Sequence, residues 1–215
     1  MNTKKLIVSA LLGLITNVAS ASNSASIGYA SDFFYRGAQK AEQSIQSSVD
    51  FEKVLMGLKG SLHACTNQSV DNGVDSYRIA GGLTHTFLDG LFNGYVGLNH
   101  FEDVDGEALS EVAVSASFGS ILNPTVSVYR DLDDSLFTFE ASASHIVDME
   151  IVDLGLSASI GNTELTNSND VTYYTVGASV SRSIGAAEGA LSVDYVDADD
   201  IDREFVFSTG LTFKF

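Results

Sequence analysis

The sequence predicts an all-β fold: a transmembrane up-and-down antiparallel barrel of about twelve strands, preceded by a cleaved signal peptide. Three observations predict this fold. Apolar residues recur at every second position through most of the chain, an export signal precedes the first such segment, and the alternate positions are mostly small and polar. Although 45% of the residues are hydrophobic, no later stretch is continuously apolar for the length of a membrane-spanning helix.

The N-terminal residues have the organisation of a signal peptide. Lys4 and Lys5 precede an apolar run over residues 6–18, and residues 19–21 read Ala-Ser-Ala, which suits signal peptidase. We therefore expect residues 1–21 to be removed and residues 22–215 to form one barrel domain. The alternative is a buried N-terminal helix, which the short run followed by small residues does not favour.

Composition excludes several classes of function. Loss of Lys4 and Lys5 takes the formal charge from −17 to −19, and so acidic a chain is a poor partner for nucleic acid. The single cysteine, Cys65, excludes an internal disulfide framework and a cysteine-based zinc site. We therefore expect no cofactor and no metal site.

The first half of the chain contains six segments in which apolar residues alternate with polar ones, as in strands with two different faces. They cover residues 24–35 (Ile27, Tyr29, Phe33, Tyr35), 44–51 (Ile45, Val49, Phe51), 54–65 (Val54, Met56, Leu58, Leu62, Ala64), 76–88 (Tyr77, Ile79, Leu83, Phe87), 91–101 (Phe92, Val96, Leu98) and 109–118 (Val112, Val114, Ala116, Phe118). Between the fourth and fifth segments, Asp89-Gly90 is a strong two-residue hairpin signal.

The second half contains six more alternating segments. They cover residues 124–130, 135–146 (Phe137, Phe139, Ala141, Ala143), 151–161 (Val152, Leu154, Leu156, Ala158, Ile160), 171–183 (Tyr174, Val176, Ala178, Val180), 190–196 (Leu191, Val193, Tyr195) and 203–215 (Phe205, Phe207, Leu211, Phe213, Phe215). The only proline, Pro124, stands at the first position of its segment, where no ladder hydrogen bond is lost.

The connections between these segments alternate in character. Tight turns are expected at residues 52–53, 89–90, 120–123, 147–150 and 185–189, and generally longer, acidic loops at residues 37–43, 66–75, 102–108, 131–134, 162–170 and 197–202. Short turns at one end and longer loops at the other are typical of a Gram-negative outer-membrane barrel with both termini in the periplasm. A soluble β-sandwich is the alternative, but its polar face would be richer in lysine and glutamate.

Several residues on the apolar parity lie near strand ends, where an interfacial girdle is expected. The predicted membrane-interface residues are Tyr35, Tyr77, Arg130, Tyr174, Arg203, Phe213 and Phe215. Arg130 and Arg203 would pair with lipopolysaccharide phosphates or extend to the interface, two alternatives that the sequence leaves open. The closing strand that ends in Phe215 resembles the C-terminal signature strand of bacterial outer-membrane barrels, which implies recognition by the barrel-assembly machinery.

The histidines and acidic loops give no specific catalytic or metal motif. His85, His100 and His145 fall on the outward parity, His63 falls inward, and none of the four is followed two residues later by a serine in a His-x-Ser pattern. We therefore predict no catalytic residue and no enzyme, with a triad assembled across strands left open. The acidic runs at residues 103–107 and 197–202 lack EF-hand spacing, so solvated loops are the expectation, with calcium binding or ionic bridging to lipopolysaccharide as alternatives.

A barrel of twelve strands lies between sizes that side chains fill and sizes that leave an aqueous channel. The inward positions are mainly Gly, Ala, Ser and Thr, so a narrow water-filled pore for passive diffusion of small hydrophilic solutes is expected. The predicted pore-lining residues are Asp32, Arg36, Asp50, Lys59, His63, Arg78, Glu111, Glu140, Asp153, Asp194, Glu204 and Lys214. Acidic residues outnumber lysines and arginines in this set, which predicts weak cation preference. The alternative is a closed structural or surface-interaction barrel with acidic extracellular loops.

One stretch carries a family resemblance. Residues 31–39 read Ser-Asp-Phe-Phe-Tyr-Arg-Gly-Ala-Gln and are followed by Val-Asp-Phe at residues 49–51. This pattern resembles the TorF-type family of outer-membrane porins, which implies a small transport barrel without naming a solute. Because Asp32 and Arg36 are four residues apart on one predicted strand, we expect both to face inward and to pair near the pore mouth.

Overall fold

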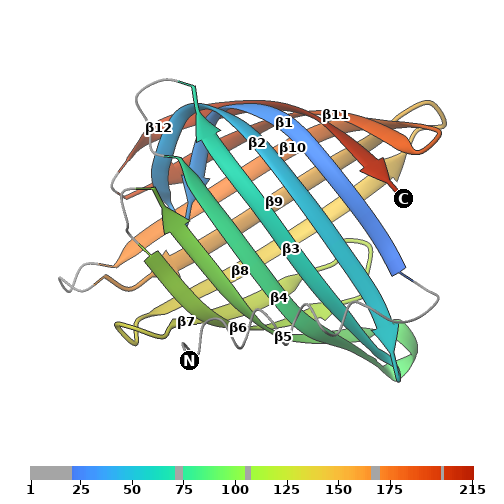
Figure 1. Cartoon of the computed structure of the whole chain (residues 1–215), viewed down its shortest axis with the longest axis horizontal. Helices are drawn as coiled ribbons and strands as arrows, with labels where there is room; N and C mark the ends of the chain where they lie inside the picture. The colour runs from blue at the N-terminus through green and yellow to red at the C-terminus, as the bar shows by residue number, and fades with distance from the viewer. Residues whose placement is uncertain (1–20, 71–74, 105–107, 166–169, 200) are drawn as a thin grey trace.

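The computed structural model describes residues 21–70, 75–104, 108–165, 170–199 and 201–215. The predicted signal peptide lies outside these residues, except for Ala21. Within the described residues, twelve antiparallel strands form a closed barrel, in which each strand pairs with its neighbours in sequence and β1 pairs with β12 (Figure 1). The predicted fold class is confirmed. No helix in the described ranges has the length and hydropathy needed to cross a membrane.

The strand bounds follow the predicted segments closely, with most ends extended by a few residues. The strands are β1 (Ala21–Tyr35), β2 (Ala38–Leu55), β3 (Leu58–Ser69), β4 (Ser76–Phe87), β5 (Phe92–Asp103), β6 (Ala108–Phe118), β7 (Thr125–Asp131), β8 (Phe137–Asp148), β9 (Asp153–Thr163), β10 (Val171–Ile184), β11 (Ala187–Ala198) and β12 (Ile201–Lys214). A 3-10 turn, η1 (Leu88–Gly90), joins β4 to β5 at the predicted Asp89-Gly90 hairpin.

The outer face of the barrel is apolar and exposed. Phe205 on β12 is 62% exposed, Leu191 on β11 is 64% exposed and Val126 on β7 is 59% exposed. The same holds for apolar residues on most other strands, so the exposed apolar surface encircles the barrel. Soluble monomers rarely expose contiguous apolar surface of this extent, which rules out the β-sandwich alternative and leaves lipid as the medium that covers it.

Two predicted connections are wrong, and both lie on β2. The predicted turn at residues 52–53 is regular strand, because Glu52 pairs with Ser22 and Ser61, and the chain reverses instead at Met56 and Gly57. Both turn residues have positive φ angles, 52° and 79°, as a tight two-residue hairpin requires. The predicted loop at residues 37–43 is also mostly strand, since a two-residue turn at Arg36 and Gly37 leads directly into Ala38.

Strand β1 begins and strand β12 ends at the same rim of the barrel (Figure 1). Ser24 pairs with Lys214 in the ladder between β1 and β12, and the Phe215 amide donates to the Asn23 carbonyl at 3.0 Å. The turns after β2, β4, β6, β8 and β10 lie at this rim. The opposite rim carries the connections that follow the odd-numbered strands, and it is called the loop rim below.

Glycines on the inner face make room for tyrosines. Tyr173 on β10 lies across Gly161 on β9, so closely that a Cβ atom at Gly161 would overlap the tyrosine ring. The tyrosine ring therefore lies along the barrel wall and its hydroxyl reaches toward the lumen.

We expect Gly161→Ala to destabilise the barrel by about 1–3 kcal/mol, because the new methyl group displaces a buried ring. The measurement is the urea midpoint of unfolding of the refolded barrel in detergent micelles. Gly60→Ala on β3 is the matched control, since the atoms nearest to its new Cβ lie 3.7 Å away. Equal midpoints for the two variants would contradict the packing of Tyr173 against Gly161.

Candidate functional site: a constriction in the barrel lumen

Contacts between strands that are not neighbours identify the inside of the barrel. Tyr173 on β10 donates a hydrogen bond to Glu140 on β8 at 3.0 Å. Arg36, which follows β1, forms an ion pair with Glu111 on β6 at 3.1 Å. In a closed barrel such partners meet only across the lumen, so Tyr173, Glu140 and Glu111 mark the inner face.

The strand registers extend this inner face around the whole barrel, because directly paired residues share a face. Starting from Glu111 and Glu140, the ladders place eleven of the twelve predicted pore-lining residues on the inner parity: Asp32, Asp50, Lys59, His63, Arg78, Glu111, Glu140, Asp153, Asp194, Glu204 and Lys214. The twelfth, Arg36, belongs to a turn. That these residues line a conducting pore stays a prediction.

Arg36 is the centre of a buried cluster in the lumen. Its Nη2 atom lies 3.1 Å from Glu111 Oε2, and its Nη1 atom lies 3.6 Å from Glu140 Oε2. The arginine side chain is 12% exposed and that of Glu111 is 4% exposed. A planar guanidinium suits two carboxylates at once because its donors diverge in a fixed fork. The cluster therefore ties the end of β1 to β6 and β8.

Aromatic rings surround this charge cluster. The Arg36 guanidinium carbon lies 3.4 Å from the centroid of the Tyr129 ring, in cation–π contact. Tyr35 is stacked on Phe101 with ring centroids 4.6 Å apart, and its hydroxyl donates to Glu111 at 3.2 Å. Side chains from β1, β5, β6, β7, β8 and β10 thus meet in the interior near the loop rim, and we call this group the constriction.

The β1–β2 hairpin reaches the constriction because its tip folds inward. Arg36 and Gly37 have φ angles of 53° and 79°, and a Cβ atom at Gly37 would lie 2.9 Å from the Tyr173 ring. Phe33 and Phe34 on β1 face Ala41 and Gln39 on β2, which leaves Lys40 of β2 as an extra, bulged residue. Such a bulge bends the hairpin, and Figure 1 shows the β1–β2 end curling toward the interior.

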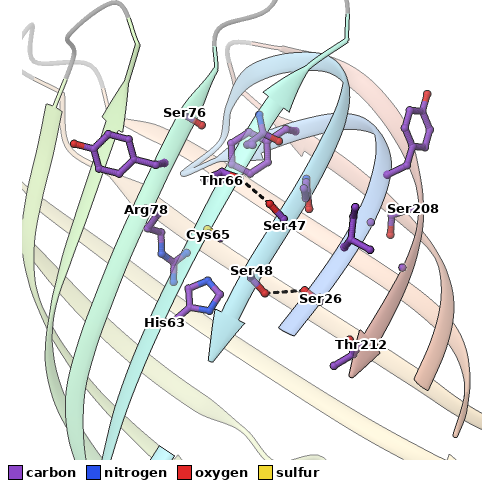
Figure 2. A pocket seen from close by; sticks show the side chains of 18 of the residues that line it. Ser26, Ser47, Ser48, His63, Cys65, Thr66, Ser76, Arg78, Ser208 and Thr212 are labelled. Atoms are coloured by element: carbon purple, nitrogen blue, oxygen red, sulfur yellow. Dashed lines mark hydrogen bonds between the residues drawn. The ribbon is translucent and has the colours of Figure 1, made fainter. Parts of the chain in front are cut away.

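This inward tip, residues 34–37, stands between two cavities. One has a volume of about 420 Å³ and is bounded by β1–β5, β11 and β12, with Ser48, His63 and Ser208 among its lining residues (Figure 2). The other has a volume of about 290 Å³ and is lined by the tip and by residues of β4, β5 and β7 to β11. Phe34, Tyr35 and Arg78 line both cavities, so the tip forms a wall that the two share.

The expected pair between Asp32 and Arg36 does not form. Asp32 instead accepts hydrogen bonds from Gln39 at 3.0 Å and from Ser31 at 2.9 Å. The physical reason is that Arg36 lies in the turn, where positive φ removes it from the strand periodicity on which the expectation depended.

Other predicted inner-face residues find local partners. His63 Nδ1 lies 2.6 Å from Asp50 Oδ1, and Lys59 Nζ lies 2.9 Å from Glu52 Oε1. Nearer the rim where β12 ends, Lys214 pairs with Glu188 at 2.8 Å. Ser192 donates to Asp194 at 3.2 Å.

The predicted interface residues divide into two groups. Tyr77, Arg130, Tyr174, Arg203, Phe213 and Phe215 are all exposed on the outside of the barrel or at its rim. Arg203 pairs with Asp197 at 3.0 Å, and Arg130 lies over the Phe137 ring. Tyr35 differs, because its contacts with Phe101 and Glu111 place it in the constriction and not at the lipid interface.

Acidic segments near the loop rim are only partly described. In the first, residues 105–107 lie outside the described residues, and Asp103 lies 3.6 Å from Lys40 Nζ. In the second, residue 200 lies outside them, and Asp199 accepts the Thr172 amide. Calcium binding by these acidic segments and their ionic bridging to lipopolysaccharide therefore stay predictions.

A serine–histidine contact, which single-strand spacing did not reveal, forms between β5 and β6. His100 Nδ1 lies 2.9 Å from Ser110 Oγ, and His100 Nε2 lies 3.2 Å from Glu102 Oε2. These residues stand on the outer face, since His100 pairs with Ser110 on the parity opposite to Glu111. Glu102 also accepts a hydrogen bond from the Tyr77 hydroxyl.

The aromatic part of the constriction was missed from the sequence, although a signal for it exists. Phe101, Tyr129 and Tyr173 fall on the inward parity of their strands, where most other residues are small. Large rings on a strand face that otherwise carries small residues indicate that side chains fill the lumen at that height. The expectation of a narrow water-filled pore, which rested on the small inward side chains, did not include this aromatic level, and it stays a prediction.

Comparison with known proteins identifies the fold. No family model matches the sequence, and no curated protein sequence does. Among solved structures, the KdgM porin superposes with a TM-score of 0.61 at 9% identity, over 89% of this chain and 99% of that chain. The COG4313 outer membrane channel from Pseudomonas putida F1 gives a TM-score of 0.59 at 8% identity, over 94% and 98% of the two chains. The NanC porin gives 0.59 at 9% identity, over 90% and 100%. At such identities the likeness shows a shared barrel fold.

We expect Arg36→Met to destabilise the barrel by about 3 kcal/mol, because it leaves the buried Glu111 carboxylate without its cation. The double variant Arg36→Met/Glu111→Gln should recover at least about 1 kcal/mol of that loss, since the orphaned charge is gone. Urea unfolding of the refolded variants measures both values. Strictly additive effects of the two substitutions would show that the ion pair does not couple them.

Proposed function

We propose that this chain is a porin-like channel of a Gram-negative outer membrane, through which small hydrophilic solutes diffuse passively. Support for an outer-membrane location comes from the closed barrel with its apolar outer face and from its likeness in fold to outer-membrane porins. The resemblance of residues 31–39 to the TorF-type family supports the same proposal.

One observation carries the proposal: the lumen holds a cavity on each side of a narrow, charged constriction. The cavity of about 420 Å³ is lined by hydroxyl groups from several strands, including Ser26, Ser208 and Thr212 (Figure 2). Hydroxyls and charges replace part of the hydration shell of a passing solute, whereas a structural barrel needs only a packed interior. In this proposal the constriction sets the size limit of the solute.

The finer part of the proposal is weak cation preference. The inner parity carries more carboxylates than lysines and arginines, and Asp194 and Asp50 stand on it away from the constriction. A narrow, partly desolvated lumen strengthens the field of such charges and concentrates cations in it.

Two partners follow from this function. We propose that the strand ending in Phe215, which closes the barrel against β1, presents its aromatic residues to the barrel-assembly machinery. We also propose that lipopolysaccharide phosphates contact Arg130, which is exposed on the outer face and has no carboxylate partner among the described residues.

The main alternative is a closed barrel whose acidic loops bind at the cell surface. If the inward tip and its ion pairs always stay in the lumen, they block it, which favours the closed barrel. The channel and the closed barrel differ in one measurable property, which is whether the assembled barrel conducts ions.

A second candidate function rests on the Ser110, His100 and Glu102 contacts. A serine within hydrogen-bond distance of a histidine that also contacts a carboxylate is the arrangement of a nucleophilic serine. If Ser110 is nucleophilic, a fluorophosphonate probe labels the folded barrel and fails to label Ser110→Ala. Equal labelling of the wild-type barrel and of Ser110→Ala, or labelling of neither, would contradict a nucleophilic role for Ser110.

We expect the refolded barrel to give discrete conductance steps in a planar bilayer, and Arg36→Ala to give larger steps because it removes the side chain that crosses the constriction. Arg130→Ala is the control, since it deletes an arginine of equal charge from the outer face. A silent bilayer from wild-type protein that is folded by gel heat-modifiability would support the closed barrel.

Reversal potentials under a salt gradient measure the proposed ion preference. We expect a sign that corresponds to cation preference in the wild-type barrel and a smaller potential for Asp194→Asn, which removes an inner-face charge. Asp197→Asn, on the outer face, should leave the potential unchanged. Anion preference in the wild-type barrel would refute this part of the proposal.

A further inference from the structure

Arg78 is an arginine of the inner wall that stands apart from the ion pairs of the constriction. It lies on β4, directly paired with Cys65 on β3 and with Phe101 on β5. Figure 2 shows its side chain extending along the cavity wall toward His63. It lines both cavities, so a solute on either side of the inward tip would meet it.

The guanidinium of Arg78 has no carboxylate partner among the described residues, in contrast to Arg36 with its two glutamates. Its Nε atom is buried and makes no hydrogen bond within the part of the chain that the structure describes. An arginine has five N–H donors and no way to lose its charge, so these donors require acceptors.

Asn67 adds a second unpartnered group beside Arg78. It is 4% exposed, and both its Nδ2 and its Oδ1 atoms lack a hydrogen-bond partner among the described residues. It lines the larger cavity together with Arg78. Because Asn67 pairs with Ser76 and Cys65 pairs with Arg78, the two side chains are diagonal neighbours on one face.

Buried polar groups in folded proteins are almost always hydrogen-bonded, so two unpartnered groups on one cavity wall call for a common ligand. A guanidinium fork matches a carboxylate in two parallel hydrogen bonds. A neighbouring amide, with one acceptor and two donors, matches a hydroxyl group. The cavity volume of about 420 Å³ falls in the range of small-molecule sites.

We infer that Arg78 and Asn67 form a solute subsite for a small hydroxylated monocarboxylate. A single carboxylate is the favoured class because the rest of the inner face is rich in carboxylates, which repel a polyanion more strongly than a monoanion. The aromatic stack of Tyr35 on Phe101 forms an adjoining wall that suits the carbon skeleton of such a solute. This inference rests on the proposed channel function, because the subsite would select among solutes that enter the lumen.

The test is equilibrium binding to the full mature chain refolded in detergent, by saturation-transfer NMR with three probes. Gluconate carries a carboxylate and hydroxyls, acetate carries the carboxylate alone, and glucitol carries the hydroxyls alone. We expect gluconate to bind most tightly, acetate more weakly, and glucitol not detectably at equal concentration.

Variants assign the two halves of the subsite. Arg78→Gln should weaken the binding of gluconate and acetate by about tenfold, because it removes charge-assisted hydrogen bonds. Asn67→Ala should weaken gluconate binding and leave acetate binding unchanged, since acetate offers no hydroxyl group. Arg130→Gln, which removes an arginine from the outer face, should change neither. Heat-modifiability on a gel establishes that each variant is folded.

Absence of gluconate binding to the folded wild-type barrel would overturn the inference, and so would equal binding to wild type and Arg78→Gln. The latter result would mean that water satisfies these groups in the lumen. Conductance, recorded separately, distinguishes the two levels of proposal. A barrel that conducts without binding gluconate keeps the channel and loses the subsite, whereas a silent barrel that binds gluconate keeps the subsite and loses the channel.

Discussion

The pairing of β1 with β12 is the contact on which the rest of the structure depends. In a lipid environment an open sheet edge leaves backbone N–H and C=O groups without partners, so a sheet of this kind is stable only when it closes. Closure also fixes which alternate residues of every strand face inward, because directly paired residues on neighbouring strands share one face of the sheet. The apolar outer face and the polar lumen are thus two results of one constraint.

Within the closed barrel, the constriction is built by a local exception to strand regularity. The residues that meet there from β5, β6, β7, β8 and β10 follow the regular inward parity, whereas those at the end of β1 do not. A two-residue turn at Arg36 and Gly37 and one extra residue, Lys40, redirect the hairpin tip into the lumen. Most of the barrel is therefore regular, and the constriction is completed by one irregular turn held by ion pairs.

The sequence predicted the regular part of this structure and missed the irregular part, for a physical reason. Alternation of period two reports the face of a residue wherever the backbone is extended, so Glu111, Glu140 and Arg78 were placed on the inner face from parity alone. Tyr35 was assigned to the wrong face and Arg36 to the wrong partner, because a positive φ angle and a bulge interrupt that period. The pairing of Arg36 with Glu111, 75 positions later, depends on barrel closure and has no local signal. The contact between His100 and Ser110 was missed for the same reason, since it forms across two strands.

The inward tip also constrains the order in which the chain assembles. Its residues contact β6, β8 and β10, which are synthesised after it and lie on the far side of the lumen from β1 and β2. Once β1 and β12 have paired, the wall is continuous and the tip has access to its partners only through the loop rim. The tip must therefore be enclosed while the sheet is still open or enter through that rim afterwards. Either route makes the first hairpin of the chain one of the last parts to reach its native contacts.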